Sequence, residues 1–83
     1  MNYQHKYYLV EAETSRVLGN ATQAADLYIR SINLAHKNEY LQEEALANEL
    51  AANFYLSKGH NLVGCTYMRQ ARYCYLKLSL IHI

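Results

Sequence analysis

The sequence predicts an all-α fold of four antiparallel helices, arranged as two helix-turn-helix units that form a fragment of an α–α superhelix. The 83 residues contain no proline and three glycines, too few turn residues for a sheet of short strands. Apolar residues recur at three- and four-residue steps, which is typical of helices with one buried face. Positions around Gly19 also match positions around Gly59 when the chain is shifted by 40 residues. A chain of this length holds one small domain.

The helices are expected at residues 3–18, 21–37, 40–58 and 61–77. Gly19 and Gly59 suit the left-handed position just after a helix, where a Cβ is strained. Asn20 can cap the second helix, with Gln23 at the capping-box spacing. The connection at residues 37–39 is short, which makes neighbouring helices antiparallel.

Each predicted helix has an apolar face that we expect to be buried. The first stripe is loose, and the other three are more regular. The expected faces are Tyr3, Tyr7, Val10, Thr14 and Val17; Ala21, Ala24, Ala25, Tyr28, Ser31, Ile32 and Ala35; Ala47, Leu50, Ala51, Phe54 and Tyr55; and Gly64, Tyr67, Met68, Ala71, Cys74 and Tyr75.

Small residues on these faces predict closely packed helix pairs, because small side chains let two helix axes approach. The predicted structural residues of the helix crossings and turns come from both units. They are Ala12, Gly19, Ala24, Tyr28, Ala52, Gly59, Gly64, Met68 and Ala71.

This set of residues resembles the tetratricopeptide repeat, which has small residues at its helix crossings and a Gly before its turn. The first unit spans about residues 3–37 and the second about 40–77. Several features depart from the family pattern: the period is 40 instead of about 34 residues, Asn48 stands where Trp is frequent, Glu11 stands where Leu is usual, and no Pro follows the second helix of a unit.

A second resemblance is carried by about residues 43–77. The run Glu44–Ala52, the segment Phe54-Tyr55-Leu56, Gly59, and the segments Tyr67-Met68 and Ala71–Tyr75 look like the helical-repeat region of large bacterial signalling kinases. Those chains combine a serine/threonine-kinase-like domain, an AAA-type ATPase module and a sensor histidine kinase. The resemblance implies a non-catalytic, cytoplasmic scaffold or coupling segment for signal transduction, without a cofactor of its own, in a parent kinase that binds ATP.

Residues 78–83 (Leu-Ser-Leu-Ile-His-Ile) resemble an in-frame translation of a sequencing-library adapter. In the signalling-kinase family a Trp-Gly-Ala usually stands here. We therefore expect the native domain to cover residues 1–77 and the last six residues to be a non-native tail.

Charge is distributed unevenly along the chain, although the net charge is only +1. Residues 1–50 carry all seven acidic residues against four basic ones, whereas residues 51–83 carry four basic residues and no acid. Arg69 and Arg72 are the candidate partner-facing residues, and we expect Arg72 to reach Glu43 or Glu44 and Arg69 to stay unpaired. The predicted partners are neighbouring domains of the parent or another protein or peptide, with no nucleic acid, membrane or small-molecule substrate.

No motif for catalysis, cofactor binding or metal binding is present. The glycines form no phosphate loop, and Cys65 and Cys74 lie on opposite sides of one helix, so they can neither bridge nor share a metal ion. Two other functions remain open: a free-standing peptide-binding adaptor, and the regulatory helical region of a transcription activator with an ATPase module.

Overall fold

The computed structural model describes residues 4–81, which form four α-helices. They are α1 (Gln4–Val17), α2 (Ala21–Lys37), α3 (Leu41–Ser57) and α4 (Asn61–Ile81). The predicted bounds differ by at most one residue, except at the end of α4, which continues four residues past the predicted end at 77. Residues 78–81 contain neither Gly nor Pro, so nothing in them breaks the helix.

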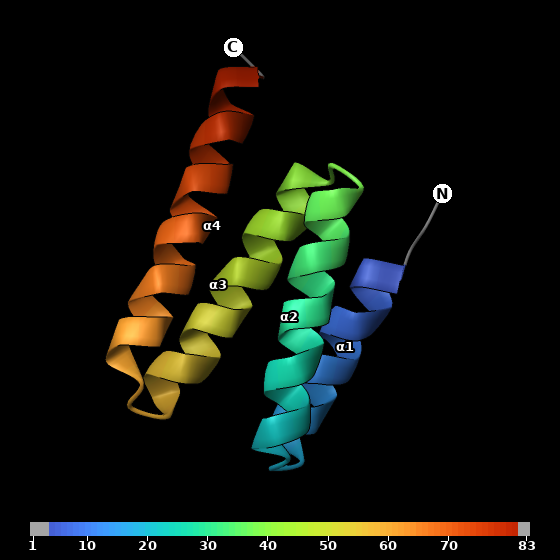
Figure 1. The fold of residues 1–83 in the computed structure, drawn as a ribbon, viewed down its shortest axis with the longest axis vertical. Helices are drawn as coiled ribbons and strands as arrows, with labels where there is room; N and C mark the ends of the chain where they lie inside the picture. Colours follow the sequence, from blue (N-terminus) through green and yellow to red (C-terminus); the bar gives the residue numbers. More distant parts are fainter. Residues whose placement is uncertain (1–3, 82–83) are drawn as a thin grey trace.

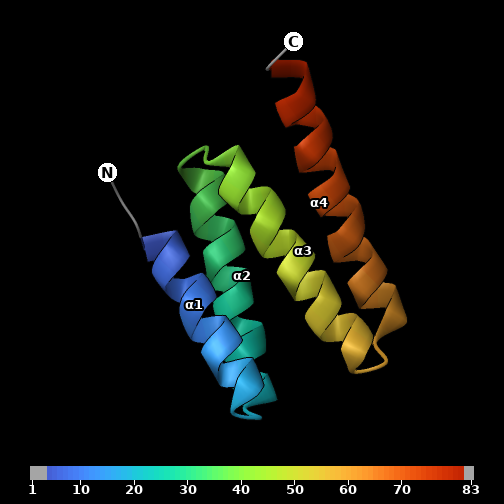
Figure 2. The same ribbon diagram turned by 180° about the vertical axis from the view of Figure 1, so that it is seen from behind.

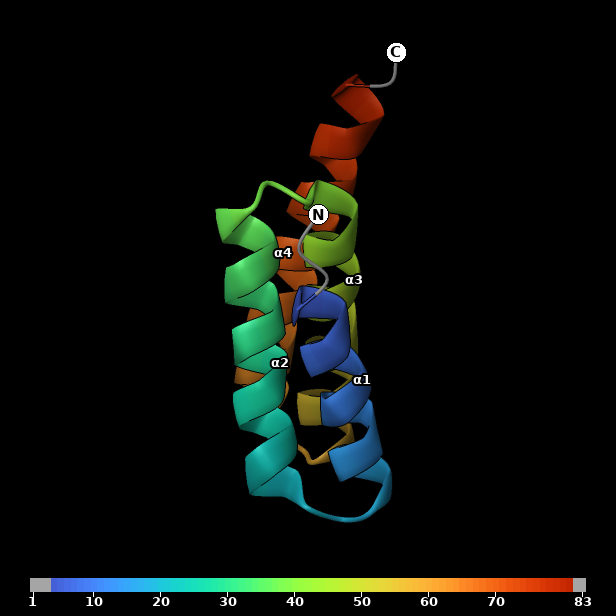
Figure 3. The ribbon, with the colours of Figure 1, turned by 90° about the vertical axis from the view of Figure 1, so that its right-hand side faces the viewer.

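The helices pack in chain order and alternate in direction (Figure 1). α1 packs on α2, α2 on α3, and α3 on α4, and α3 also touches α1. Seen from behind, α3 lies between α4 and the α1–α2 pair (Figure 2). In the side view, α1 and α3 lie toward one side of the molecule and α2 toward the other (Figure 3). The row therefore has two end helices, α1 and α4.

All three connections have the same backbone geometry. Gly19 (φ 84°), Glu39 (φ 61°) and Gly59 (φ 81°) each take the left-handed conformation after a helix, at intervals of 20 residues. The amide of the next residue (Asn20, Tyr40 or His60) then donates to the carbonyl five residues back, over 2.8–2.9 Å. This is the Schellman type of helix end. The left-handed conformation of both glycines is confirmed, and Glu39 adopts it without being a glycine.

The start of α2 is capped as predicted. The Asn20 side chain accepts from the Gln23 amide at 3.2 Å and donates to the Gln23 side chain at 2.8 Å. Tyr40, in the same position before α3, makes no side-chain cap.

The core lies where the units meet, and small residues make it thin. Its central cluster joins Ala12 of α1, Ala24 and Tyr28 of α2, and Ala51 and Phe54 of α3. The Tyr28 and Phe54 rings lie 5.4 Å apart, centroid to centroid. In the second unit a Cβ on Gly64 would come within 2.6 Å of Leu56 Cγ and 3.2 Å of the Leu56 backbone nitrogen. Gly64 therefore lies where α3 and α4 approach closely.

The predicted face of α1 is wrong. Tyr7, Val10, Thr14 and Val17 are exposed, and Tyr3 lies outside the described residues. α1 instead buries a polar and small face of His5, Ala12 and Ser15. The stripe failed because α1 ends the row and packs through small residues, so its large apolar residues face outward. Tyr75 of α4, the other end helix, is likewise more exposed than predicted, at 42%.

Candidate interaction surfaces

The first candidate surface is a groove between α1 and α3, which we call the α1–α3 groove. Its apolar floor is formed by Leu9 and Val10 of α1 and Leu46 of α3. Lys6 and Glu43 lie at its polar edge, with Lys6 Nζ 3.6 Å from Glu43 Oε1. The groove follows from packing small faces together, which leaves the larger apolar side chains of both helices facing outward.

His5 also lines this groove, although only 3% of its surface is exposed. Its ring packs on the Tyr40 ring at 4.8 Å, and neither ring nitrogen has a hydrogen-bond partner. The His5 backbone is held in place because the Ser31 hydroxyl donates to its carbonyl at 2.7 Å. A buried imidazole without partners retains its full capacity to bond a ligand group.

The second candidate surface lies between α3 and α4, and we call it the α3–α4 groove. It is lined by Glu49, Met68, Ala71, Arg72, Tyr75 and Leu76. The Tyr75 hydroxyl donates to Glu49 Oε1 at 2.8 Å, which fixes the carboxylate at one edge. Arg72 makes no ion pair within residues 4–81.

The predicted contact of Arg72 with Glu43 or Glu44 is therefore wrong. Glu43 pairs with Lys6 of α1, and Glu44 lies 3.1 Å from His36 Nδ1 of α2. Both carboxylates are directed toward the first unit because α3 packs against α1 and α2 as well as α4. Arg69 is exposed and, as expected, has no ion pair among the described residues.

A buried polar contact holds the first unit together. The hydroxyl of Tyr28, which is fully buried, donates to the Glu13 carboxylate, and Arg16 donates to the same carboxylate at 2.9 Å. Burial raises the pKa of Tyr28, and the neighbouring Glu13 carboxylate raises it further. The phenol therefore stays protonated and acts as a donor over the physiological pH range.

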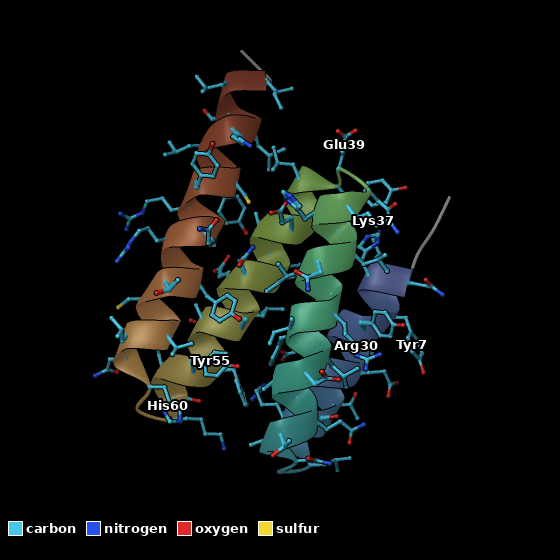
Figure 4. The ribbon with its side chains drawn as sticks, in the orientation of Figure 1. Tyr7, Arg30, Lys37, Glu39, Tyr55 and His60 are labelled. Carbon is cyan, nitrogen blue, oxygen red and sulfur yellow. The ribbon has the colours of Figure 1, made fainter. Side chains whose placement is uncertain are left out.

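Aromatic and thiol groups occupy the corresponding region of the second unit. The rings of Tyr55 and Tyr67 stack at 5.5 Å with an interplanar angle of 3°, and Tyr55 lies near the α3–α4 connection that carries His60 (Figure 4). Burial, followed by the nearby Glu44, raises the pKa of the Cys74 thiol to about 11. Cys74 is thus an unreactive core thiol, whereas Cys65 is exposed.

The structure places the predicted structural residues in two groups. Ala12, Ala24, Tyr28, Ala52, Gly64 and Ala71 are buried, and Met68 is half-buried at the edge of the α3–α4 groove. Gly19 and Gly59 occupy the turns. Sequence reasoning missed the α1–α3 groove, although the poor fit of Val10 and Val17 to one regular stripe was a signal that they belong to an exposed surface.

The described residues carry no site for chemistry. Within 4–81, no group of three His, Cys, Asp or Glu side chains could hold a metal ion. Over the same range, no helix is both long and apolar enough to cross a membrane. What the geometry offers is two shallow surfaces with apolar floors and charged edges.

Comparisons of the chain with known protein families, curated proteins and solved structures give no match.

Proposed function

We propose that this chain is a tetratricopeptide-like, non-catalytic scaffold that couples neighbouring domains of a multidomain bacterial signalling kinase in the cytoplasm. The observation that carries the proposal is the frame of three equivalent connections at residues 19, 39 and 59. Such a frame gives each helix pair the same relation to the next pair, which is how helical-repeat proteins build extended binding surfaces. The signalling-kinase parent is supported by the resemblance of residues 43–77.

Coupling through such a segment depends on how its helix pairs pack. Stacked pairs interact with their neighbours alone, so a change at one helix crossing alters the relation between whatever lies on either side. Gly64 is the sharpest place to intervene, because it lies at the α3–α4 contact, away from the charged edges of both grooves.

The test begins with the reading frame around the coding region. An ATPase module encoded before the segment and a sensor kinase encoded after it support the proposal. In that full-length protein, Gly64→Leu should abolish the dependence of autophosphorylation on the input signal while basal phosphorylation remains. Cys65→Ser, at an exposed neighbouring position, is the matched control. Signal dependence that survives Gly64→Leu, or a frame without kinase modules, contradicts the proposal.

A second candidate function is a free-standing peptide-binding adaptor. The α1–α3 groove favours it, because an apolar floor lies beside the unpartnered imidazole of His5. Peptides selected from a random displayed library against the chain should then perturb the NMR signals of His5 and Leu46, and His5→Phe should weaken their binding. Selected peptides that perturb neither signal exclude this function.

A further inference from the structure

The two units offer an internal comparison for the α3–α4 groove. A shift of 40 residues superposes the α1–α2 turn on the α3–α4 turn, so each groove residue has an equivalent in the first unit. The equivalents of Glu49, Met68, Ala71, Arg72, Tyr75 and Leu76 are Leu9, Tyr28, Ser31, Ile32, Ala35 and His36.

In the first unit these equivalents form the surface on which α3 packs. Tyr28, Ser31 and Ala35 are buried, and Leu9 and Ile32 pack against the central cluster to which α3 contributes. Tyr28 touches Phe54 of α3, as their ring contact shows, and His36 contacts Glu44 of α3. The α3–α4 groove is thus the same kind of surface, one unit further along the row, and it lies open to solvent.

The covering helix also has an equivalent, which is α1. Leu50, Ala51 and Phe54, through which α3 joins the central cluster, correspond to Val10, Glu11 and Thr14 of α1. Val10 and Thr14 are exposed and Glu11 is half-buried. Tyr7, the equivalent of Ala47, projects from the side of α1 away from α4 (Figure 4).

We propose that a second copy of this chain docks its α1 into the α3–α4 groove, head to tail, as α3 docks on α2 within the chain. Charge favours this occupant. Ile32 and Ala51, an apolar pair of the internal interface, are replaced at the two ends by Arg72 and Glu11. Neither of these has an ion-pair partner within residues 4–81, and they are opposite in sign. The acidic first fifty residues and the basic remainder reinforce the attraction between copies.

The two surfaces lie at opposite ends of the helix row (Figures 1 and 2). A head-to-tail contact between them leaves one free end on each copy, so assembly is open-ended and not limited to a dimer. The polar residues on α1 make this contact weaker than the internal one. Association should therefore be visible as a rise in mean mass between roughly 10 µM and 1 mM chain.

The experiment uses complementary end mutants in sedimentation velocity at low salt. Arg72→Glu faces Glu11 with a like charge, and Glu11→Arg faces Arg72 with a like charge. Each variant alone should therefore associate at least about tenfold more weakly than the unmodified chain. Mixed together, the Arg72→Glu variant retains an intact α1 and the Glu11→Arg variant an intact α3–α4 groove, so they should form a species of two chains and grow no further.

Arg69→Glu is the matched control. It removes the same charge from the same helix, but its equivalent Ile29 is 40% exposed and is not part of the central cluster. It should self-associate like the unmodified chain. A chain that stays monomeric at 1 mM, equal loss in the Arg69→Glu and Arg72→Glu variants, or a mixture that fails to associate would each overturn the proposal.

This inference does not depend on the proposed function. It concerns the ends of the helix row alone, and a failure of the mixing experiment leaves the signalling experiment, which relies on Gly64, unaffected.

Discussion

The first and second units share one backbone frame but are held together by different chemistry. In the first unit, Ala12 and Ala24 are buried and a phenol–carboxylate hydrogen bond joins Tyr28 of α2 to Glu13 of α1. In the second, Gly64 lies against Leu56, and the contact between the helices includes the stacked Tyr55 and Tyr67 rings. The frame is therefore specified by the turns and by small residues, while the fastening of each helix pair is free to vary.

The difference predicts where each unit is vulnerable. A unit fastened by close fit is sensitive to added volume, whereas one fastened by a polar contact is sensitive to the loss of a single atom.

The largest effect is expected for Gly64→Leu. A Cβ alone would approach Leu56 too closely, and the backbone nitrogen at 3.2 Å cannot move aside as a side chain can. We expect a loss of about 3 kcal/mol or more in the free energy of unfolding, at the upper end of overpacking costs. Urea denaturation followed by circular dichroism measures it.

Gly59→Ala is the comparison variant for Gly64→Leu. Nothing lies within 4 Å of a Cβ at Gly59, so left-handed strain of about 1–2 kcal/mol is the cost. Denaturation midpoints in the reverse order would remove the α3–α4 crossing as the explanation.

In the first unit, Tyr28→Phe should cost about 1.5–3 kcal/mol, as for other hydrogen bonds to charged groups. The pH dependence provides a sharper test. Because the pKa of Tyr28 is raised in the folded state, its contribution is complete below the ordinary tyrosine pKa of about 10 and is lost as the pH rises above it. Tyr28→Phe should therefore flatten the alkaline loss of stability, whereas Tyr73→Phe, at an exposed position, should leave it unchanged.

The sequence predicted the frame because the signals are local. Gly19, Gly59 and the Asn20–Gln23 cap act within one turn of the chain, and alanines at three- and four-residue steps define helix faces whatever they pack against. Gly64 was found in the same way, since it is the one glycine that falls on an apolar face.

The surfaces were harder to predict because they depend on what lies beside each helix. The stripe of Tyr7, Val10 and Val17 looks like a core face until α1 is seen to end the row. Glu43 and Glu44 were assigned to Arg72 on helix direction alone, and the competing partners Lys6 and His36 come from helices far away in sequence. Glu39 shows no local signal for a left-handed residue; only the 20-residue spacing between the glycines points to it.

Glu39 gives a smaller effect of opposite sign. It adopts in the middle connection the conformation that glycine adopts in the other two. Glu39→Gly should stabilise the chain by about 0.5–1 kcal/mol, because it relieves left-handed strain of about 1–2 kcal/mol and adds flexibility to the unfolded chain. An upward shift of the thermal midpoint is the expected result. Glu39→Ala, which keeps the strain, is the control, and equal midpoints for the two variants would contradict the explanation.

The smallest effect concerns the exposed cations of α2 and α4. Arg30 pairs with Asp26 at 2.9 Å on its own helix, whereas Arg69 lies three residues before Arg72, and no acid follows Glu49. Charge reversal should therefore act in opposite directions. Arg30→Glu breaks a favourable pair and should cost about 0.3–0.5 kcal/mol. Arg69→Glu replaces a like-charge neighbour of Arg72 with an opposite one and should leave stability unchanged or raise it by up to about 0.5 kcal/mol. Urea denaturation at chain concentrations below those that favour self-association measures both variants. A clear loss of stability from Arg69→Glu would mean that Arg69 has a partner within the folded chain, and the surface of α4 would then no longer differ from that of α2 in having unpaired cations.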